Sequence, residues 1–248
     1  MKTAAKNQTI GCLCLHGFTG SPWEVEPIAE ELRANTDWIV EAPVLPGHAD
    51  GSFSIQNRVS YVTWIHAADR AAKKLAAACS TLYVIGFSMG GLLACYVAAR
   101  YEVERLVLIG MPMEYINPGQ FLKDMLLVAS GRVRGSLHPW YGVAAEKLKT
   151  PGWALREFQQ AARVLRPFVG KVTCPVFIGQ GEKDGLVPVR SAARIYKTVN
   201  SPVKQFMLYK DGKHFLFHGP HRHEAVNDVK LFLTSAQINA ENLMRTID

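Results

Sequence analysis

Short apolar runs alternate along the chain with longer segments in which apolar residues recur at helical spacing. The short runs are typical of buried strands and lie at 9–15, 38–40, 82–87, 106–109, 175–179 and 204–209. Helical spacing follows at 21–32, 59–78, 89–100, 191–198 and 224–235. Near-continuously apolar strands separated by helices indicate a parallel sheet that is buried on both faces. We therefore predict an α/β fold, with helices on each side of a mostly parallel sheet.

The first helical segment opens with a start signal. Ser21 can cap a helix, Pro22 suits the first helical position, and Glu24 completes a capping box. We therefore predict that this helix begins at 21–24. Its apolar face consists of Val25, Ile28, Ala29 and Leu32.

The segment 111–170 interrupts the alternation. It has no strand-like run, whereas 121–129 and 154–165 show a helical pattern. Long insertions between two strands are usually functional lids or caps. We therefore predict a single domain, with an α/β core at 1–110 and 171–248 and a cap insertion at 111–170. The apolar residues of this segment can line an acyl site or form the cap's own core: Phe121, Leu122, Met125, Leu126, Leu127, Trp140, Tyr141, Trp153, Leu155 and Phe158.

The net charge of the chain does not alter the predicted fold. The 248 residues include 28 Lys and Arg against 21 Asp and Glu, which gives a net charge of +7 and a pI near 9.2. The basic residues are dispersed, although 111–170 has a net charge of +4. A solvated cationic surface explains this pattern, so we expect no nucleic-acid partner. No apolar run approaches the roughly 20 residues of a membrane span, so we expect no stable membrane insertion.

The number and positions of the cysteines indicate the redox environment of the cellular compartment. There are five of them, and they lie in apolar stretches. An odd number in such positions is typical of free thiols in a reducing environment. Residues 1–9 are polar and lead into no signal-peptide pattern, so we predict a cytoplasmic protein. Cys12 and Cys14 share one face of a strand, but only His16 follows them at close spacing, so we predict no metal site there.

The strongest chemical signal is the sequence Gly86-Phe87-Ser88-Met89-Gly90. It matches the G-x-S-x-G pattern, with an apolar strand directly before it and a helical segment directly after it. In such a tight turn only small residues fit two places before and after the serine. The turn lifts the serine hydroxyl above the sheet, beside the unpaired N–H groups of the helix N-terminus. Ser88 is therefore the candidate nucleophile.

A serine hydroxyl needs a base, and histidine has the suitable pKa. Of eight histidines, His214 lies in the loop after the last predicted strand. The carboxyl ends of parallel strands line the ligand crevice, so this position can face Ser88. His218 is the alternative. A metal site formed by 214, 218, 221 and 223 lacks an acidic or cysteine ligand at matching spacing, and we predict a solvated turn instead.

A carboxylate that orients the base is expected after the preceding strand. There the chain reads Gly181-Glu182-Lys183-Asp184-Gly185. Asp184 is the candidate, with the role of holding the imidazole tautomer and stabilising the imidazolium. Glu182 and Asp211 are its rivals, and each has an alternative use as a turn residue. Asp184 is favoured because the acid and the base then come from separate strand ends.

Negative charge that develops on a carbonyl oxygen needs two hydrogen-bond donors. One is the amide of Met89, directly after the nucleophile. The other is expected in the loop 16–20, with sequence His-Gly-Phe-Thr-Gly, where the Phe18 amide is the best candidate. An ordinary glycine-rich turn is the alternative for this loop.

These motifs together resemble those of the α/β-hydrolase superfamily, in particular bacterial carboxylesterases and monoacylglycerol lipases with a small helical cap. The resemblance covers essentially the whole chain and rests on 15–22, Pro46-Gly47-His48, 86–91, and Asp184 followed by His214. It implies the triad Ser88, Asp184 and His214, oxyanion donors at Phe18 and Met89, and no metal or organic cofactor. Two departures stand out: Lys213 takes the place of the usual glycine before the histidine, and only one strand precedes the loop 16–20.

The sequence therefore predicts a serine hydrolase of carboxylic esters that works through an acyl-enzyme. The expected partner is a small-molecule ester, either a short- to medium-chain ester or a monoacylglycerol. A thioesterase or a C–C bond hydrolase can use the same triad, and a non-catalytic binding protein can keep the same fold. A nucleic-acid binder is a weaker alternative that rests on the pI alone. The oligomeric state is not predicted.

Overall fold

The computed structural model of the protein describes residues 9–48, 58–113, 150–236 and 243–247. These residues form a seven-stranded sheet with the strand order β2-β1-β3-β4-β5-β6-β7, in which every neighbouring pair is parallel. The strands are β1 (Ile10–Leu15), β2 (Ile39–Glu41), β3 (Thr81–Phe87), β4 (Arg105–Ile109), β5 (Val176–Gly181), β6 (Lys204–Tyr209) and β7 (Leu243–Ile247). The predicted α/β architecture is confirmed.

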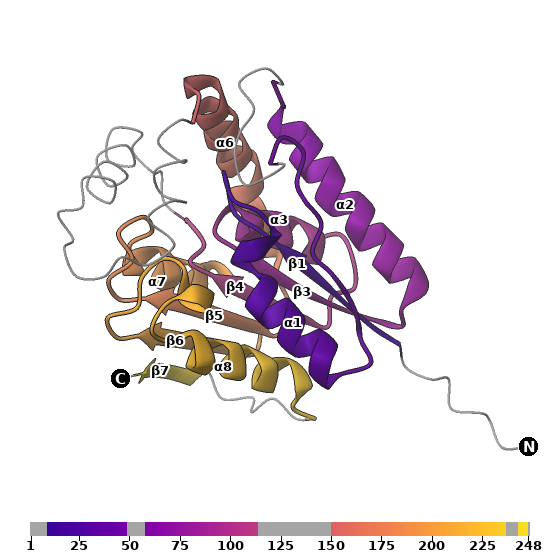
Figure 1. Ribbon diagram of the computed structural model, residues 1–248, viewed down its shortest axis with the longest axis vertical. Coiled ribbons are helices and arrows are strands. Elements are labelled where there is room, and N and C mark those ends of the chain that lie inside the picture. Colours follow the sequence, from indigo (N-terminus) through magenta and orange to yellow (C-terminus); the bar gives the residue numbers. More distant parts are fainter. Residues whose placement is uncertain (1–8, 49–57, 114–149, 237–242, 248) are drawn as a thin grey trace, which may run out of the picture.

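Helices cover both faces of this sheet (Figure 1). One face carries α1 (Glu26–Asn35) and α8 (Arg222–Thr234). The other carries α2 (Tyr61–Ala78), α3 (Met89–Ala98), α6 (Gly152–Leu165) and α7 (Val189–Thr198). Short 3-10 helices lie at η1 (Pro22–Glu24), η3 (Arg166–Lys171) and η4 (Leu216–His218).

The two faces produce two hydrophobic cores. Successive strand side chains point to opposite faces, so Cys12 and Cys14 of β1 join the core under α1 and α8. Leu13 and Leu15 join the core under α2 and α3. This arrangement explains why the central strands are apolar without interruption.

The order of the strands reverses direction at β1. The chain runs from β1 to β2 on one side and then crosses back to β3 on the other, with Leu15 of β1 in register with Gly86 of β3. In open α/β sheets ligands bind at such a switch point, outside the carboxyl ends of the strands. The loop 16–20 follows β1 and Ser88 follows β3, so both motifs lie at this point.

Two sequence-based expectations about local structure need correction. Ser21 makes no side-chain capping bond, and the helix α1 begins only at Glu26, after the short turn η1. The capping box is therefore wrong, because Glu24 forms a tertiary hydrogen bond instead. The strand β7 was not predicted; it lies at the sheet edge, where Met244 is exposed, so it lacks the apolar pattern of a buried strand.

Only part of the predicted cap segment 111–170 is described. The predicted helix at 154–165 is present as α6, whereas the one predicted at 121–129 lies outside the described residues. Helix α6 packs into the same core as α2 and α3. Its Glu157 carboxylate accepts a hydrogen bond of 2.9 Å from the backbone N–H of Tyr61, the first residue of α2. A carboxylate is favourable at a helix N-terminus, so this contact ties α6 to α2.

All five cysteines are free thiols. Cys12, Cys14 and Cys95 are buried, and burial raises the pKa of Cys174 to about 12 and that of Cys95 further. The thiols of Cys95 and Cys174 therefore stay protonated near neutral pH and have little nucleophilic character.

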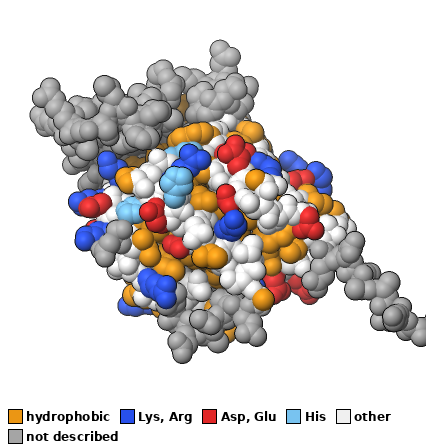
Figure 2. Space-filling view, turned by 60° about the horizontal axis from the view of Figure 1, so that its bottom comes forward, with side chains coloured by type: hydrophobic (Ala, Val, Ile, Leu, Met, Phe, Trp, Pro, Cys, Tyr) orange, Lys and Arg blue, Asp and Glu red, His pale blue; other side chains and the backbone are white. Residues whose placement is uncertain are grey.

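The described surface carries charges of both signs. Figure 2 shows Lys and Arg side chains interspersed with Asp and Glu on the face that it presents. Within the described ranges, no helix is long and apolar enough to cross a membrane.

Arg105 links the end of α8 to the sheet through hydrogen bonds. This buried side chain on β4 donates hydrogen bonds to the carbonyls of Phe232 at 2.6 Å, Leu233 at 2.8 Å and Ser235 at 2.7 Å. These carbonyls belong to the last turn of α8 and its C-cap, where helical partners are missing. The positive guanidinium is also favourable at the negative end of the helix.

We predict that Arg105→Met lowers the free energy of unfolding by about 2–4 kcal/mol, because it leaves these carbonyls buried without a donor. The matched control is Arg100→Met. Arg100 pairs with Asp69 at 3.3 Å while its side chain is 53% exposed, and such pairs contribute less than about 1 kcal/mol. Urea unfolding of both variants measures the difference, and equal losses would contradict this role for Arg105.

Candidate active site

Ser88 occupies a strained turn between β3 and α3. Its backbone has φ 52° and ψ −120°, an unusual conformation for a residue with a side chain. The surroundings hold it there: the Ser88 N–H donates to the Ile109 carbonyl of β4 at 2.8 Å, and the Gly91 N–H donates to the Ser88 carbonyl at 2.9 Å. The predicted strand–turn–helix around Ser88 is therefore present.

Two glycines allow this turn to form. A Cβ at Gly86 would overlap the backbone of Gly90 and Gly91, and a Cβ at Gly90 would overlap the carbonyl oxygen of Leu15. Helix α3 thus packs its first turn directly against the backbone of β1 and β3. The side chain of Met89 is fully buried beneath this turn, and Met89 is the first residue of the helix, where backbone N–H groups lack helical partners.

Asp184 and His214 meet in a buried hydrogen bond. The His214 Nδ1 lies 2.8 Å from the Asp184 Oδ2, and their side chains are 8% and 1% exposed. The carboxylate also accepts hydrogen bonds of 2.9 Å from the backbone N–H groups of Leu186 and Val187. A carboxylate can only accept a hydrogen bond, so the Nδ1 of the neutral imidazole must carry the proton. This leaves Nε2 as an acceptor.

The alternative candidates, Glu182 and Asp211 for the acid and His218 for the base, have other partners. The exposed Asp211 forms an ion pair with Lys183, and the exposed Glu182 accepts a hydrogen bond from the Asp211 N–H. The ring of His218 stacks on Trp23 with centroids 3.6 Å apart, and its Nε2 contacts the Trp23 carbonyl. No group of three or more His, Cys, Asp or Glu in the described part of the chain is placed to hold a metal ion.

Gln180 is a site residue that the sequence reasoning missed. It is fully buried at the end of β5, and its Nε2 donates to the Asp184 Oδ2 and to the Val187 carbonyl, each at 3.0 Å. This amide fixes the Asp184 loop and adds a fourth donor to the carboxylate, after His214 and the N–H groups of Leu186 and Val187. A signal was present in the sequence, because a glutamine in an otherwise apolar strand end has to find buried partners.

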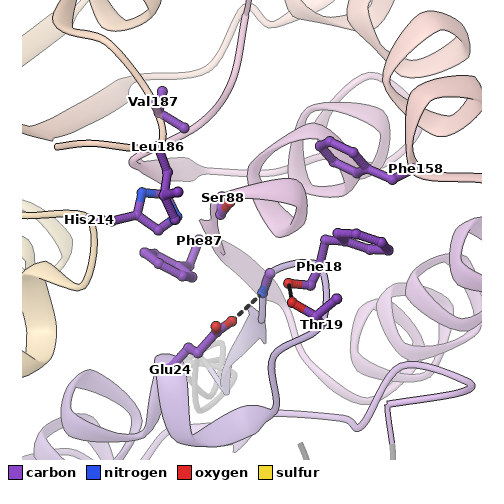
Figure 3. A pocket seen from close by; sticks show the side chains of 10 residues that line it. Phe18, Thr19, Glu24, Phe87, Ser88, Phe158, Leu186, Val187 and His214 are labelled. Atoms are coloured by element: carbon purple, nitrogen blue, oxygen red, sulfur yellow. Dashed lines mark hydrogen bonds between the residues drawn. The ribbon is translucent and has the colours of Figure 1, made fainter. Parts of the chain in front are cut away.

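One pocket connects these features (Figure 3). Ser88 and His214 both line it, so the predicted nucleophile and base share one cavity. These two described side chains make no direct hydrogen bond to each other, and in unliganded sites such bonds often tighten only when substrate binds. The remaining lining is mostly apolar and is formed by Gly17, Phe18, Thr19, Glu24, Phe87, Phe158, Leu186 and Val187.

An aromatic cluster joins the loop after β1 to helix α6. The rings of Phe18 and Phe158 are stacked with centroids 4.8 Å apart, and Phe18 also packs on Trp64 of α2 at 5.9 Å. Phe158 was among the predicted lining residues of 111–170, and its place in the pocket wall agrees with that use.

A parallel α/β sheet with a serine turn and an Asp–His pair at its carboxyl edge is the arrangement of the α/β-hydrolase fold. Residues 12–229 match the profile of the Alpha/beta hydrolase family, so the chain belongs to that family.

Relatives and solved structures agree with this membership. The chain is 26% identical over 225 residues to the thermostable monoacylglycerol lipase of Bacillus sp. (strain H-257), covering 85% of this chain and 84% of the relative. It is 22% identical over 229 residues to a carboxylesterase of Bacillus subtilis (strain 168), covering 89% and 91%. A structure of the metagenome-derived lipolytic enzymes LipS and LipT superposes with a TM-score of 0.72 at 21% identity, covering 91% and 94%. Family and relatives together identify the chain as a hydrolase.

The close packing at Gly90 generates a prediction. Gly90→Ala is expected to lower the free energy of unfolding by at least about 2 kcal/mol, because the new methyl group meets the Leu15 carbonyl. Gly152→Ala is the matched control, since Gly152 also lies in the first turn of a helix and a Cβ there meets nothing within 4 Å. That control is expected to raise stability by up to about 1 kcal/mol. Thermal unfolding measures both, and a Gly90→Ala variant as stable as the parent would contradict the packing argument.

Proposed function

We propose that the protein hydrolyses carboxylic esters, with Ser88 as nucleophile, His214 as general base and Asp184 as the residue that orients it. The observation that carries the proposal is the buried hydrogen bond of 2.8 Å between Asp184 and His214, at the pocket that Ser88 lines. A carboxylate bonded to Nδ1 leaves Nε2 ready to take a proton. The names of the two Bacillus relatives support the same reaction.

The proposed reaction has two halves. The Ser88 oxygen attacks the ester carbonyl carbon while its proton moves to Nε2 of His214, and the carbonyl oxygen becomes an oxyanion held by the amides of Phe18 and Met89. The C–O bond to the alcohol then breaks, and the leaving alkoxide takes the proton from His214. Water then attacks the acyl carbon while its proton moves to His214. The bond to the Ser88 oxygen breaks, that oxygen takes the proton back from His214, and the carboxylic acid leaves.

The apolar wall of the pocket is suited to an acyl group. Phe18, Phe158, Leu186 and Val187 present apolar surface beside Ser88, as an acyl chain requires. We propose short- to medium-chain esters or a monoacylglycerol as substrates, with 111–170 as a cap over the site. The proposed reaction uses no metal or organic cofactor. The five free cysteines support a place in the cytoplasm.

The nucleophile is tested by Ser88→Ala. This variant is expected to lose more than about 10³-fold of its rate on a p-nitrophenyl ester, because the attacking oxygen is gone. The matched control is Ser80→Ala, an exposed serine whose loss should leave the rate unchanged. A fluorophosphonate probe should add its mass to Ser88 in the parent and not in the variant. Hydrolysis that persists in Ser88→Ala would remove Ser88 from the mechanism, and a parent that does not react would favour a binding protein.

The acid is tested by two substitutions of the same kind. Asp184→Asn is expected to lower kcat by about 10³- to 10⁴-fold, because an amide no longer holds the imidazole in the required tautomer. Asp211→Asn removes an exposed partner of Lys183 and should leave kcat within about twofold. Steady-state kinetics on the same ester compares them, and a larger loss in Asp211→Asn would reverse the assignment. Rates on matched thioesters and on C–C bonded substrates separate the alternative chemistries.

A further inference from the structure

A second buried carboxylate lines the same pocket and has no part in the proposed proton transfers. Glu24 in η1 is only 2% exposed, although it belongs to a residue type that is rarely buried without a specific partner. Its Oε2 accepts a hydrogen bond of 2.7 Å from the backbone N–H of Gly17 (Figure 3). This contact joins the start of the first helical segment to the loop 16–20.

Gly17 separates Glu24 from the nucleophile. A Cβ built on Gly17 would lie 3.0 Å from the Glu24 Oε2 and 3.1 Å from the Ser88 Cβ. The carboxylate also lies directly against Gly20, where an added Cβ would overlap it. Glu24 therefore packs against Gly17 and Gly20 of the loop 16–20, and Ser88 approaches the same side of Gly17.

The next peptide group is fixed by His16. The Leu45 N–H donates to the His16 Nε2 at 3.0 Å, so the neutral ring carries its proton on Nδ1, which lies 2.9 Å from the Gly17 carbonyl oxygen. Gly20 N–H also reaches that oxygen, at 3.3 Å. Both polar groups of Gly17 are thus bonded to the protein. In a trans peptide the Phe18 N–H points away from the Gly17 carbonyl, so these bonds also set the direction of the proposed oxyanion donor.

The loop needs such support because its backbone is strained. Thr19 has φ 59°, a left-handed conformation that is unfavourable for a residue with a branched side chain. A strained conformation persists only when its surroundings determine it. The bond from Gly17 to Glu24 is an anchor that comes from outside the loop itself.

We propose that Glu24 is a positioning residue that holds the loop 16–20 in the geometry required for oxyanion stabilisation; this rests on the proposed function. Its negative charge is unfavourable near a developing oxyanion, so its contribution is geometric. A neutral acceptor of the same shape should therefore replace it in large part, whereas its removal should impair the transition state more than the binding of substrate.

The test is Glu24→Ala, with Glu24→Gln as the conservative variant. Glu24→Ala is expected to lower kcat by about 10- to 100-fold while KM changes less than about threefold. Glu24→Gln keeps an oxygen for the Gly17 N–H and should stay within about tenfold of the parent. The affinity of a trifluoromethyl ketone, which forms a tetrahedral adduct with the serine, should fall in parallel with kcat/KM. A residue that only stabilises the fold would not produce this parallel.

Controls separate the possible outcomes. Glu26→Ala removes a carboxylate two positions away that pairs with Arg33 at the surface, and it should leave kinetics unchanged. Gly20→Ala displaces the Glu24 carboxylate without removing it and should reproduce the kcat loss, which covers the case that Glu24→Ala does not fold.

The inference is overturned by a Glu24→Ala variant with the parent's kcat, by a loss confined to KM, or by a Glu24→Gln variant as impaired as Glu24→Ala. These results leave the proposed function standing if the parent still hydrolyses esters in a Ser88-dependent manner. A parent without that activity removes both.

Discussion

The N-terminal turn of α3 lies directly on the backbone of two adjacent strands, with no side chain between them. Gly86 and Gly90 are the residues that permit this contact, and every other part of the site is arranged around the serine that the turn presents. The contact sets the distance between Ser88 and the loop after β1, because Gly90 touches the carbonyl of Leu15. A side chain at either glycine would separate the hydroxyl from its surroundings by more than catalysis tolerates.

Three buried charged side chains in the described part of the chain bond to backbone groups. Asp184 accepts from two backbone amides, Glu24 accepts from one, and Arg105 donates to three carbonyls. A buried ion is costly when it is unpaired, and peptide dipoles offer partners whose positions the fold already determines. Two of these three charges, Asp184 and Glu24, hold loops at the carboxyl edge of the sheet. Their hydrogen bonds to the backbone therefore serve both the stability of the fold and the geometry of the site.

Much of this arrangement was predictable from the sequence. The apolar runs identify six of the strands, and the pattern around Ser88 identifies its turn, because both signals are local. The pairing of Asp184 with His214 follows from a rule about strand ends, and the structure brings these two side chains together. Glu24 shows where local rules fail: its spacing from Ser21 fits a capping box, yet its partner is Gly17, seven positions earlier in another loop. The strand β7 was missed because it pairs only with β6 at the sheet edge and has no distinctive composition. Gln180 was missed although its partners Asp184 and Val187 are close in sequence, because the loop that brings them to its amide is not visible in the residue pattern.

The position of β1 has a consequence for biosynthesis. This strand leaves the ribosome first among the described strands, yet it lies between β2 and β3 and gains its second neighbour only when residues 81–87 have been made. The histidine of the site follows more than a hundred residues later, after β6. A nascent chain that has not yet reached residue 214 therefore presents the Ser88 turn without the Asp184–His214 pair beside it.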